Sequence, residues 1–283
     1  MSGTLFVVGT PIGNLDDVTI RAAEVLRAVG VCYAEDTRRT RTLLGHLGAR
    51  TPIKSLHQHN EQARVEEILK QLKSGVSLAL VSDAGTPTIS DPGCRVLQAV
   101  LDEGGNVSPI PGPSAVVSAL SVSGFSANRF VFVGFPPRRG KARNVWISDA
   151  VSTEETFVVF EAPRRLAKLL VDLVEAGIGT RQAVVCRELT KLHEEVVSGT
   201  ITELATIYGE GSVKGEVTIV VSGAVGVIDA ELDLVTIRES SKAWAREGAS
   251  RRDIAERLVR EFGVGRNVAY RLSIQKEEGS EDE

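Results

Sequence analysis

The sequence contains few cysteines. Cys32, Cys94 and Cys186 are the only three in 283 residues, and they lie far apart. An odd number of widely spaced cysteines argues against a disulfide framework and against a zinc site, and it fits a reducing cytoplasm. His57 and His59 form an isolated H-x-H pair with no further ligand nearby. We therefore expect free, mostly buried thiols and no bound metal.

Long apolar stretches are also missing. No window approaches the ~18 uninterrupted apolar residues of a membrane-spanning helix, so we expect no association with a membrane. The first residues have neither a basic segment nor a long apolar run, so we expect no signal peptide and a cytoplasmic location. The content of hydrophobic (42%) and charged (25%) residues is that of a soluble globular protein with one large or two ordinary domains.

The net charge of −4 conceals an uneven distribution. Residues 238–276 include ten Lys or Arg and five Asp or Glu, whereas residues 277–283 include five acids and no base. A basic segment on an acidic body indicates contact with a polyanion such as nucleic acid, and a solvated helical face is the alternative interpretation. We expect the acidic tail to be disordered.

Apolar runs alternate with helical patterns along most of the chain. In the first 110 residues this alternation predicts a parallel sheet covered on both faces by helices. In the second half the runs near 196–198 and 217–221 allow antiparallel pairing, so we expect a mixed sheet there. The predicted fold is α/β, with lobes at residues 1–124 and 125–225 and a small C-terminal helical domain at residues 226–283. The predicted strands are 5–8, 31–34, 53–56, 78–81, 107–110, 130–133, 157–160, 183–186, 196–198 and 217–221.

The C-terminal segment predicts three short helices. Ser250 is the expected N-cap of a helix that turns Ile254 and Leu258 inward. The segment is similar to a helix-turn-helix, which would expose Arg266 and Arg271 to phosphates. We interpret it as an RNA-binding appendage, and a small dimerisation or packing domain is the alternative.

The predicted strand ends are followed by polar or glycine-rich loops. SDAGTPTISDPG (82–93) follows the strand at 78–81, and no helix is expected before Cys94. It is either a surface loop or a ligand loop at the carboxyl end of a parallel strand. GTPIGN (9–14) follows the first strand but lacks the pattern of a dinucleotide or phosphate loop. Further polar exits from both halves predict one ligand cleft between two lobes, at 35–40, 111–115, 160–165 and 187–191.

Seven motifs occur here in one order: GTPIGNL, EDTRRT, VSDAGTPTISDPG, PGPSA, FEAPRR, RELTK and GEVTIVVSG. In this order the chain closely resembles the small-subunit rRNA methyltransferase I group of the tetrapyrrole methylase superfamily, over about residues 4–223. The resemblance implies a two-lobed tetrapyrrole-methylase-like fold, a homodimer, and S-adenosylmethionine (SAM) bound in the cleft between the lobes. It also implies 2′-O-methylation of a cytidine ribose in the decoding region of 16S rRNA, within the small ribosomal subunit.

The resemblance also implies where SAM binds. Asp83 would face its methionyl or ribose part, and Gly85 would let it approach closely because glycine has no side chain. The second lobe would close over the adenine. An acidic pocket rich in backbone groups suits the sulfonium and ammonium groups of SAM. The implied cofactor-binding residues are Pro11, Asp83, Gly85, Thr86, Ile89, Ser114, Ala115, Phe160, Leu189 and Thr218.

Methyl transfer to a ribose is an SN2 step in which positioning does much of the work. A base with a pKa near neutrality would assist, and the candidates are Lys191, Glu188, Asp36 and Glu35. Because Glu188 and its neighbours favour a charged lysine, phosphate binding is the alternative role of Lys191. The candidate contacts to substrate RNA are Arg38, Arg39, Arg164, Arg187, Arg266 and Arg271.

Two other functions compete with this interpretation. A methyltransferase of the same superfamily would act on a tetrapyrrole or on diphthamide intermediates, but the EDTRRT and RELTK segments and the basic C-terminal region favour RNA. A non-catalytic, nucleic-acid-binding regulator would use only the C-terminal helices. Two lobes with polar loops at their strand ends argue against the regulator, and failure to bind SAM would revive it.

Overall fold

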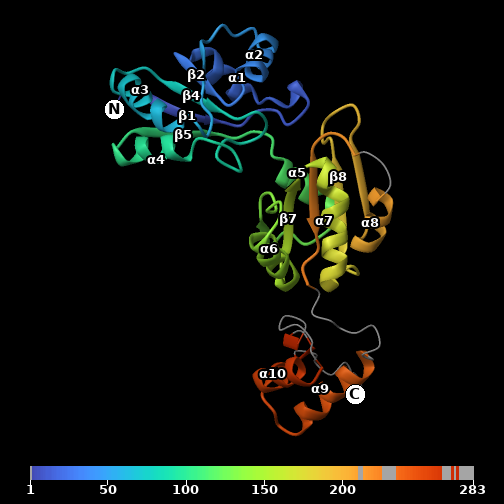
Figure 1. Cartoon of the computed structure of the whole chain (residues 1–283). Coiled ribbons are helices and arrows are strands. Elements are labelled where there is room, and N and C mark those ends of the chain that lie inside the picture. Colours follow the sequence, from blue (N-terminus) through green and yellow to red (C-terminus); the bar gives the residue numbers. More distant parts are fainter. Residues whose placement is uncertain (1, 210–212, 225–233, 263–268, 271, 274–283) are drawn as a thin grey trace, which may run out of the picture.

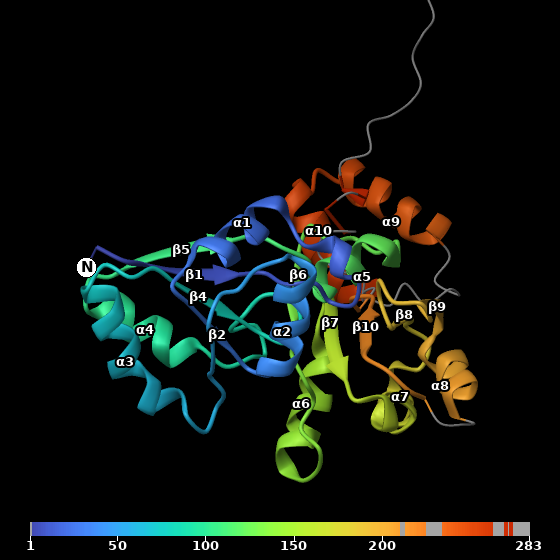
Figure 2. The ribbon, with the colours of Figure 1, turned by 90° about the horizontal axis from the view of Figure 1, so that it is seen from above.

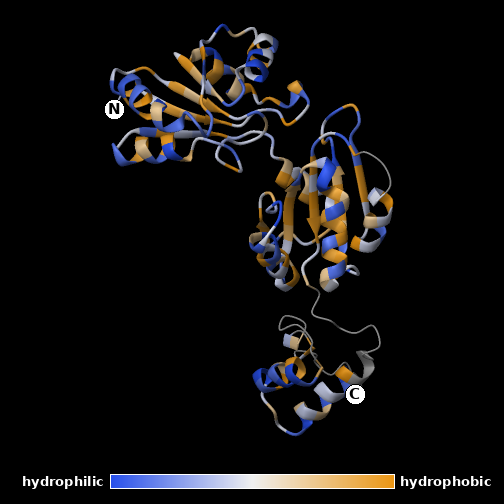
Figure 3. Cartoon of the chain, viewed as in Figure 1, coloured by the Kyte–Doolittle hydropathy of each residue, from blue (hydrophilic) through white to orange (hydrophobic). Residues whose placement is uncertain are grey.

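The computed structural model describes residues 2–209, 213–224, 234–262, 269–270 and 272–273. Two α/β lobes are followed by a helical C-terminal unit (Figure 1). Apolar residues concentrate on the strands, and polar residues lie on the outer faces of the helices (Figure 3). The predicted α/β fold with flanking helices is confirmed.

The first lobe is built on a five-stranded parallel sheet with the strand order β3-β2-β4-β1-β5. The central strand β4 (Leu78–Val81) is buried throughout, because alternate residues pack into the helical layers on its two faces. This explains its uninterrupted apolar run. Helices α1 and α2 cover one face, and α3 and α4 cover the other (Figure 2). The remaining elements are β1 (Thr4–Val8), β2 (Val31–Ala34), β3 (Ile53–Ser55), β5 (Asn106–Ile110), α1 (Ile20–Ala28), α2 (Thr37–His46), α3 (Glu61–Lys73), α4 (Cys94–Asp102) and a 3-10 turn at Leu15–Asp17.

The second lobe is built on a five-stranded sheet with the order β6-β7-β10-β8-β9. Only the pair of β6 and β7 is parallel, so the predicted mixed sheet is confirmed. Helices α6, α7 and α8 pack on one face around Phe157 and Ile219, and α5 packs on the other around Val158 and Val220. The elements are β6 (Phe130–Phe132), β7 (Thr156–Glu161), β8 (Gln182–Arg187), β9 (Glu195–Thr200), β10 (Val217–Val221), α5 (Ala115–Ser123), α6 (Lys141–Ser152), α7 (Leu166–Leu173), α8 (Ile201–Gly209) and short turns at Pro163–Arg165 and Val174–Ile178.

Helix α5 connects the lobes. Ser114 caps its start by accepting a hydrogen bond from the amide of Val117, and Gly124 ends it in the left-handed conformation. Its buried residues, Val116 and Leu120 among them, pack on the second sheet. A boundary at residue 124 would therefore separate α5 from the sheet that it covers, and the packing favours a boundary near residues 111–114.

The C-terminal unit includes α9 (Leu234–Arg246) and α10 (Arg251–Phe262). Ser250 and Asp253 cap α10 reciprocally: the amide of Asp253 donates to the Ser250 hydroxyl (3.2 Å), and the amide of Ser250 donates to the Asp253 carboxylate (3.3 Å). The inward positions predicted for Ile254 and Leu258 are confirmed. Arg266, Arg271 and the acidic tail lie outside the described residues.

The three cysteines are free, and Cys32 and Cys186 are buried whereas Cys94 is exposed. In the described part of the chain, no helix combines the length and the apolar character needed to cross a membrane. The same residues contain no group of three or more His, Cys, Asp or Glu side chains placed to hold a metal ion.

Candidate functional site

Two loops at the carboxyl ends of β1 and β4 are hydrogen-bonded to each other. The amide of Thr10 donates to the carbonyl of Gly85 (2.8 Å), and the amide of Gly85 donates to the carbonyl of Thr10 (3.1 Å). Gly85 has a φ of +77°, which glycine adopts without the strain that a side chain would cause. The segment SDAGTPTISDPG is therefore fixed against GTPIGN by its backbone, as a ligand loop requires and a free surface loop does not.

A third loop, after β5, packs against the same place. Gly9 and Gly112 bring their backbones into contact: a Cβ atom on Gly112 would lie 2.7 Å from the carbonyl carbon of Gly9. The amide of Gly9 also donates to the carbonyl of Ile110 (2.9 Å). The three loops thus form one surface at the carboxyl edge of the parallel sheet, where ligands bind in open α/β folds.

The second lobe contacts this surface on two sides. The amide of Asn14 donates to the hydroxyl of Thr190 in the β8–β9 loop (3.0 Å). On the other side, Gly134 lies against Ser90, since a Cβ atom on Gly134 would be 3.4 Å from the Ser90 hydroxyl. Both Ser90 and Thr190 have a positive φ, as do Thr88 and Glu188 in the same two loops. Such backbone strain in non-glycine residues clusters at functional sites.

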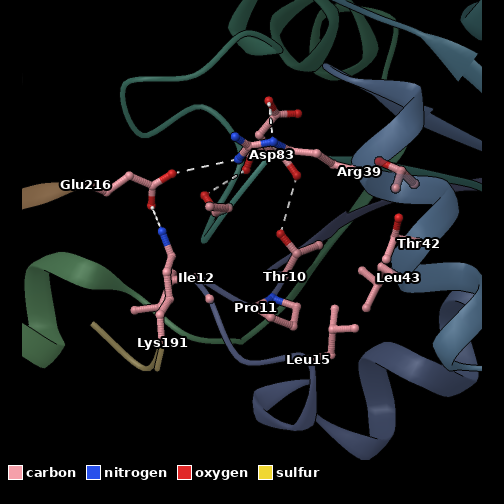
Figure 4. Close-up of a pocket in the computed structure, with 14 residues that line it drawn as sticks. Thr10, Pro11, Ile12, Leu15, Arg39, Thr42, Leu43, Asp83, Lys191 and Glu216 are labelled. Carbon is pink, nitrogen blue, oxygen red and sulfur yellow. Dashed lines mark hydrogen bonds and ion pairs between the residues drawn. The ribbon is translucent and has the colours of Figure 1, made fainter. Parts of the chain in front are cut away.

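Two adjoining cavities open between these loops. The larger has a volume of about 550 Å³ and is enclosed by both lobes. The smaller has a volume of about 430 Å³ and lies between the GTPIGN loop, α2 and side chains of the second lobe (Figure 4). Five residues line both cavities: Ile12, Arg39, Asp83, Ala84 and Glu216. A group bound in one cavity therefore lies next to a group bound in the other.

Most of the residues implied as cofactor-binding come together in the larger cavity. Pro11 lines the smaller cavity instead, and Leu189 lines neither but packs in the apolar cluster with Phe160. The implied residues that do line the larger cavity are Asp83, Gly85, Thr86, Ile89, Ser114, Ala115, Phe160 and Thr218. Sequence reasoning missed several others, namely Asp91, Phe135 and Glu216.

Three carboxylates form an acidic wall of the larger cavity. Asp83 accepts a hydrogen bond from the amide of Asp36 (2.8 Å). Burial raises the pKa of Glu35, and the charge of Asp83 adds to the rise. Burial raises the pKa of Asp91 to about 6; a hydrogen bond with Ser82 opposes the rise, and the charges of Glu35 and Asp83 add to it. An acidic wall of this kind attracts a cationic ligand.

Lys191 lies in the smaller cavity between two carboxylates. Its ammonium is 2.7 Å from Glu188. It also lies 3.1 Å from Glu216 (Figure 4). Burial lowers the pKa of Lys191, but the hydrogen bonds and charges of these two carboxylates outweigh burial and raise it. The hydrogen bond from Lys191 in turn lowers the pKa of Glu188. Both side chains are therefore charged at neutral pH, which favours a binding role for Lys191 over that of a base.

Asp36 lines neither cavity. Its carboxylate caps α2 by accepting from the amide of Arg38 (2.8 Å) and pairs with the Arg38 guanidinium at 2.6 Å. The hydrogen bonds from Arg38 lower the pKa of Asp36 to about 2. This geometry explains Asp36 as a helix cap and disfavours it as a base.

The candidate RNA contacts differ in their surroundings. Arg39 lies 3.8 Å from both Asp83 and Glu216, and so connects the two cavities. Arg187 is paired with Glu195 at 2.8 Å. Arg164 is exposed and has no ion pair within the described part of the chain.

This chain is similar to known proteins in sequence and in fold. The sequence profile described as Tetrapyrrole (Corrin/Porphyrin) Methylases matches residues 4–205. A Xylella fastidiosa protein named ribosomal RNA small subunit methyltransferase I is 46% identical over 245 residues, covering 86% of this chain and 88% of that protein. The chain therefore belongs to the tetrapyrrole methylase family, in its ribosomal RNA small subunit methyltransferase I group.

Other relatives differ in length and in distance. A Thermotoga maritima protein of the same name is 45% identical over 221 residues, which cover 99% of that protein but 78% of this chain. About a fifth of this chain thus has no counterpart in that relative. The crystal structure of diphthine synthase has a TM-score of 0.61 with 16% identity, covering 78% of this chain and 90% of that one. At this identity the likeness concerns the fold.

Proposed function

We propose that this chain transfers a methyl group from SAM to the 2′-hydroxyl of a cytidine ribose in the decoding region of 16S rRNA. The observation that carries the proposal is the larger cavity, in which Asp83, Gly85 and Asp91 come from the loop that the family resemblance assigns to SAM. The names of the relatives support the small-subunit rRNA as substrate. The ribose atom, the nucleotide and a homodimer rest on the resemblance, whereas a cytoplasmic location rests on the few, widely spaced cysteines.

The residues of the larger cavity fit SAM. Glu35, Asp83 and Asp91 would hold the cationic groups, and Gly85 leaves its side of the cavity free of a side chain. Phe160 and Thr218 of the second lobe would cover the adenine. When bound, SAM supplies an electrophilic methyl group. The smaller cavity adjoins this one along Arg39, Asp83 and Glu216, and we propose that it receives the nucleotide to be methylated.

The affinity for SAM is expected to increase with pH. Asp91, with a pKa of about 6, is mostly protonated at about pH 5 and mostly ionised at about pH 7. One additional charge pair at a half-exposed site contributes on the order of 1 kcal/mol, so SAM affinity should rise roughly fivefold over this range. Calorimetric titrations of the wild type and of Asp91→Asn at the two pH values test this. The affinity of the variant should rise much less. An equal rise in both proteins would show that Asp91 does not cause the pH dependence of SAM affinity.

The stability of the ligand-free protein is expected to change in the opposite direction. The pKa of Asp91 is higher in the folded than in the unfolded chain, so its contribution is present at low pH and is lost as the pH rises through about 6. Asp91→Asn should therefore unfold at a higher temperature than the wild type at about pH 8, and the difference should shrink at about pH 5. A variant less stable than the wild type at both pH values would contradict this sign.

Lys191 is expected to act through its charge. Lys191→Met should lower kcat/KM by roughly 10- to 100-fold, because a charge-assisted hydrogen bond to the substrate contributes about 1.5–3 kcal/mol. Lys191→Arg keeps a cation and should retain a substantial part of the activity. Rates of methyl transfer measured for both variants between about pH 6 and 9 distinguish the roles. If Lys191 were a neutral base, the arginine variant would be as inactive as the methionine variant.

The proposed function is tested by methyl transfer to purified subunits. Small ribosomal subunits from a strain lacking this gene should accept label from methyl-labelled SAM, whereas subunits from the intact strain, already methylated, should not. SAM binding without label in RNA would redirect the proposal to a small-molecule acceptor. Failure to bind SAM would leave only a nucleic-acid-binding role.

A further inference from the structure

A second basic region lies in the second lobe, and its cations line neither cavity. Between Phe135 and Ile147 the chain has four basic residues and no acidic one. Arg138, Arg139 and Lys141 are exposed, and their side chains have no ion pair or hydrogen bond within the described residues. In this they differ from Arg38, Arg39 and Arg187, which are each paired with a carboxylate.

The fourth basic residue, Arg143, fixes the shape of this loop. Its side chain is buried, donates to the carbonyl of Pro137 (2.9 Å) and pairs with Asp172 of α7 (2.8 Å). Gly140 begins α6 with a φ of +79°. The turn that presents Arg138 and Arg139 is therefore held by a buried ion pair.

The topology places this turn at the mouth of the larger cavity. Strands β6 and β7 are parallel, so their carboxyl ends lie at the same edge of the sheet. The segment after β6 brings Gly134 against Ser90 and places Phe135 in the wall of the cavity. Arg138 follows Phe135 by three residues, so their Cα atoms are at most ~11 Å apart. Arg164, also exposed and unpaired in the described structure, follows β7 at the same edge.

Phe135 adds an aromatic surface to these cations. It is exposed by 53%, and its ring lies 5.5 Å from that of Phe160, at a tilt of 56°. Exposed aromatic rings next to arginines are typical of surfaces that bind single-stranded nucleic acid, where the cations contact phosphates and the ring stacks on a base.

We propose that Arg138, Arg139 and Lys141, with Arg164, form an RNA-docking surface that holds the phosphates flanking the target nucleotide. This surface rests on the proposed function, because it supplies the flanking contacts for the nucleotide that enters the site. The cations lie beside the cavity and not in it. They therefore contribute to the capture of RNA and not to the methyl-transfer step.

The test replaces Arg138, Arg139 and Lys141 together by glutamine. The matched control replaces Arg21, Arg50 and Lys70, three exposed cations of the first lobe without ion pairs in the described structure. Both variants lose the same charge. For single-stranded nucleic acid, each lost phosphate contact reduces the slope of the logarithm of the binding constant against the logarithm of salt concentration by about 0.7. The slope of the triple variant should therefore be shallower by about 2.

The expected kinetic result is a KM for small subunits that rises roughly 10- to 100-fold in the triple variant at low salt, with kcat and SAM affinity preserved. The control variant should stay close to the wild type. Naked 16S rRNA should show the same loss of affinity as the subunits. A loss seen only with assembled subunits would identify a ribosomal protein as the partner and overturn the RNA assignment.

Two outcomes separate this proposal from the proposed function. If the wild type methylates the RNA and the triple variant behaves as the control does, only the docking surface is wrong. If the wild type transfers no methyl group to RNA, the proposed function is wrong as well. Equal thermal unfolding of the variants and the wild type shows that any loss concerns binding.

Discussion

Replacing Asp83 by asparagine is expected to weaken SAM binding by roughly 10- to 100-fold, because a hydrogen bond to a charged group contributes about 1.5–3 kcal/mol. Asp83 lies in both cavities, beside Glu35 and Asp91 and 3.8 Å from Arg39. Asparagine keeps an oxygen that can accept the hydrogen bond from the amide of Asp36. The substitution therefore removes the charge and leaves the loop its main backbone contact.

The matched control for this prediction is Asp102→Asn. Asp102 is exposed at the end of α4, where it accepts a hydrogen bond from Gln98 (2.7 Å). It undergoes the same change of charge far from the cavities, and calorimetric titration with SAM should show wild-type affinity. Wild-type affinity in the Asp83 variant too, with the fold intact, would remove Asp83 from the cofactor site.

Replacing Gly112 by alanine is expected to lower the free energy of unfolding by about 2–3 kcal/mol. The added Cβ atom would lie 2.7 Å from backbone atoms of Gly9, and backbone cannot move aside as the end of a flexible side chain can. The φ of Gly112 is not positive, so the cost is steric and not conformational. Because the contact joins the loops after β1 and β5, SAM affinity should fall along with stability.

Gly45→Ala is the control for this substitution. Gly45 lies in α2, and nothing is within 4 Å of an added Cβ atom. Glycine in a helix interior costs about 0.5–1 kcal/mol relative to alanine. Because Gly45 lies in the last turn of α2, alanine there should stabilise the protein by less than this. Urea unfolding of the two variants should therefore give changes of opposite sign. A Gly112→Ala protein as stable as the wild type would show that the loops can separate without cost.

Most strands could be predicted closely because they are short apolar runs bounded by turn residues. β4 is the clearest case, since its four consecutive apolar residues are buried on both faces. Helix α6 could not be predicted in the same way. Most of its residues are exposed, and only Arg143 and Ala150 are buried, so it has no apolar stripe at helical spacing. Its buried arginine depends on a partner in α7, which the local sequence does not indicate.

The part of the site that follows from the parallel topology of the first sheet could be predicted from the sequence. Loops that follow parallel strands meet at one edge, so the sequence predicts that Asp83, Gly85 and Ser114 lie close together. Contacts across the lobes follow from tertiary packing alone. The bond from Asn14 to Thr190 joins residues 176 positions apart, and Glu216 meets Lys191 and Arg39 only in the folded chain. Likewise, the sequence alone does not show that Asp91 is buried in the folded chain, and this burial raises its pKa.

Identification of the methylated nucleoside tests the proposed reaction. Small subunits from a strain lacking this gene are incubated with the purified protein and methyl-labelled SAM, and the digested 16S rRNA is analysed by mass spectrometry. We expect label in 2′-O-methylcytidine at a single site of the decoding region. Label in a base-methylated nucleoside, or no label in RNA from a protein that binds SAM, would contradict it.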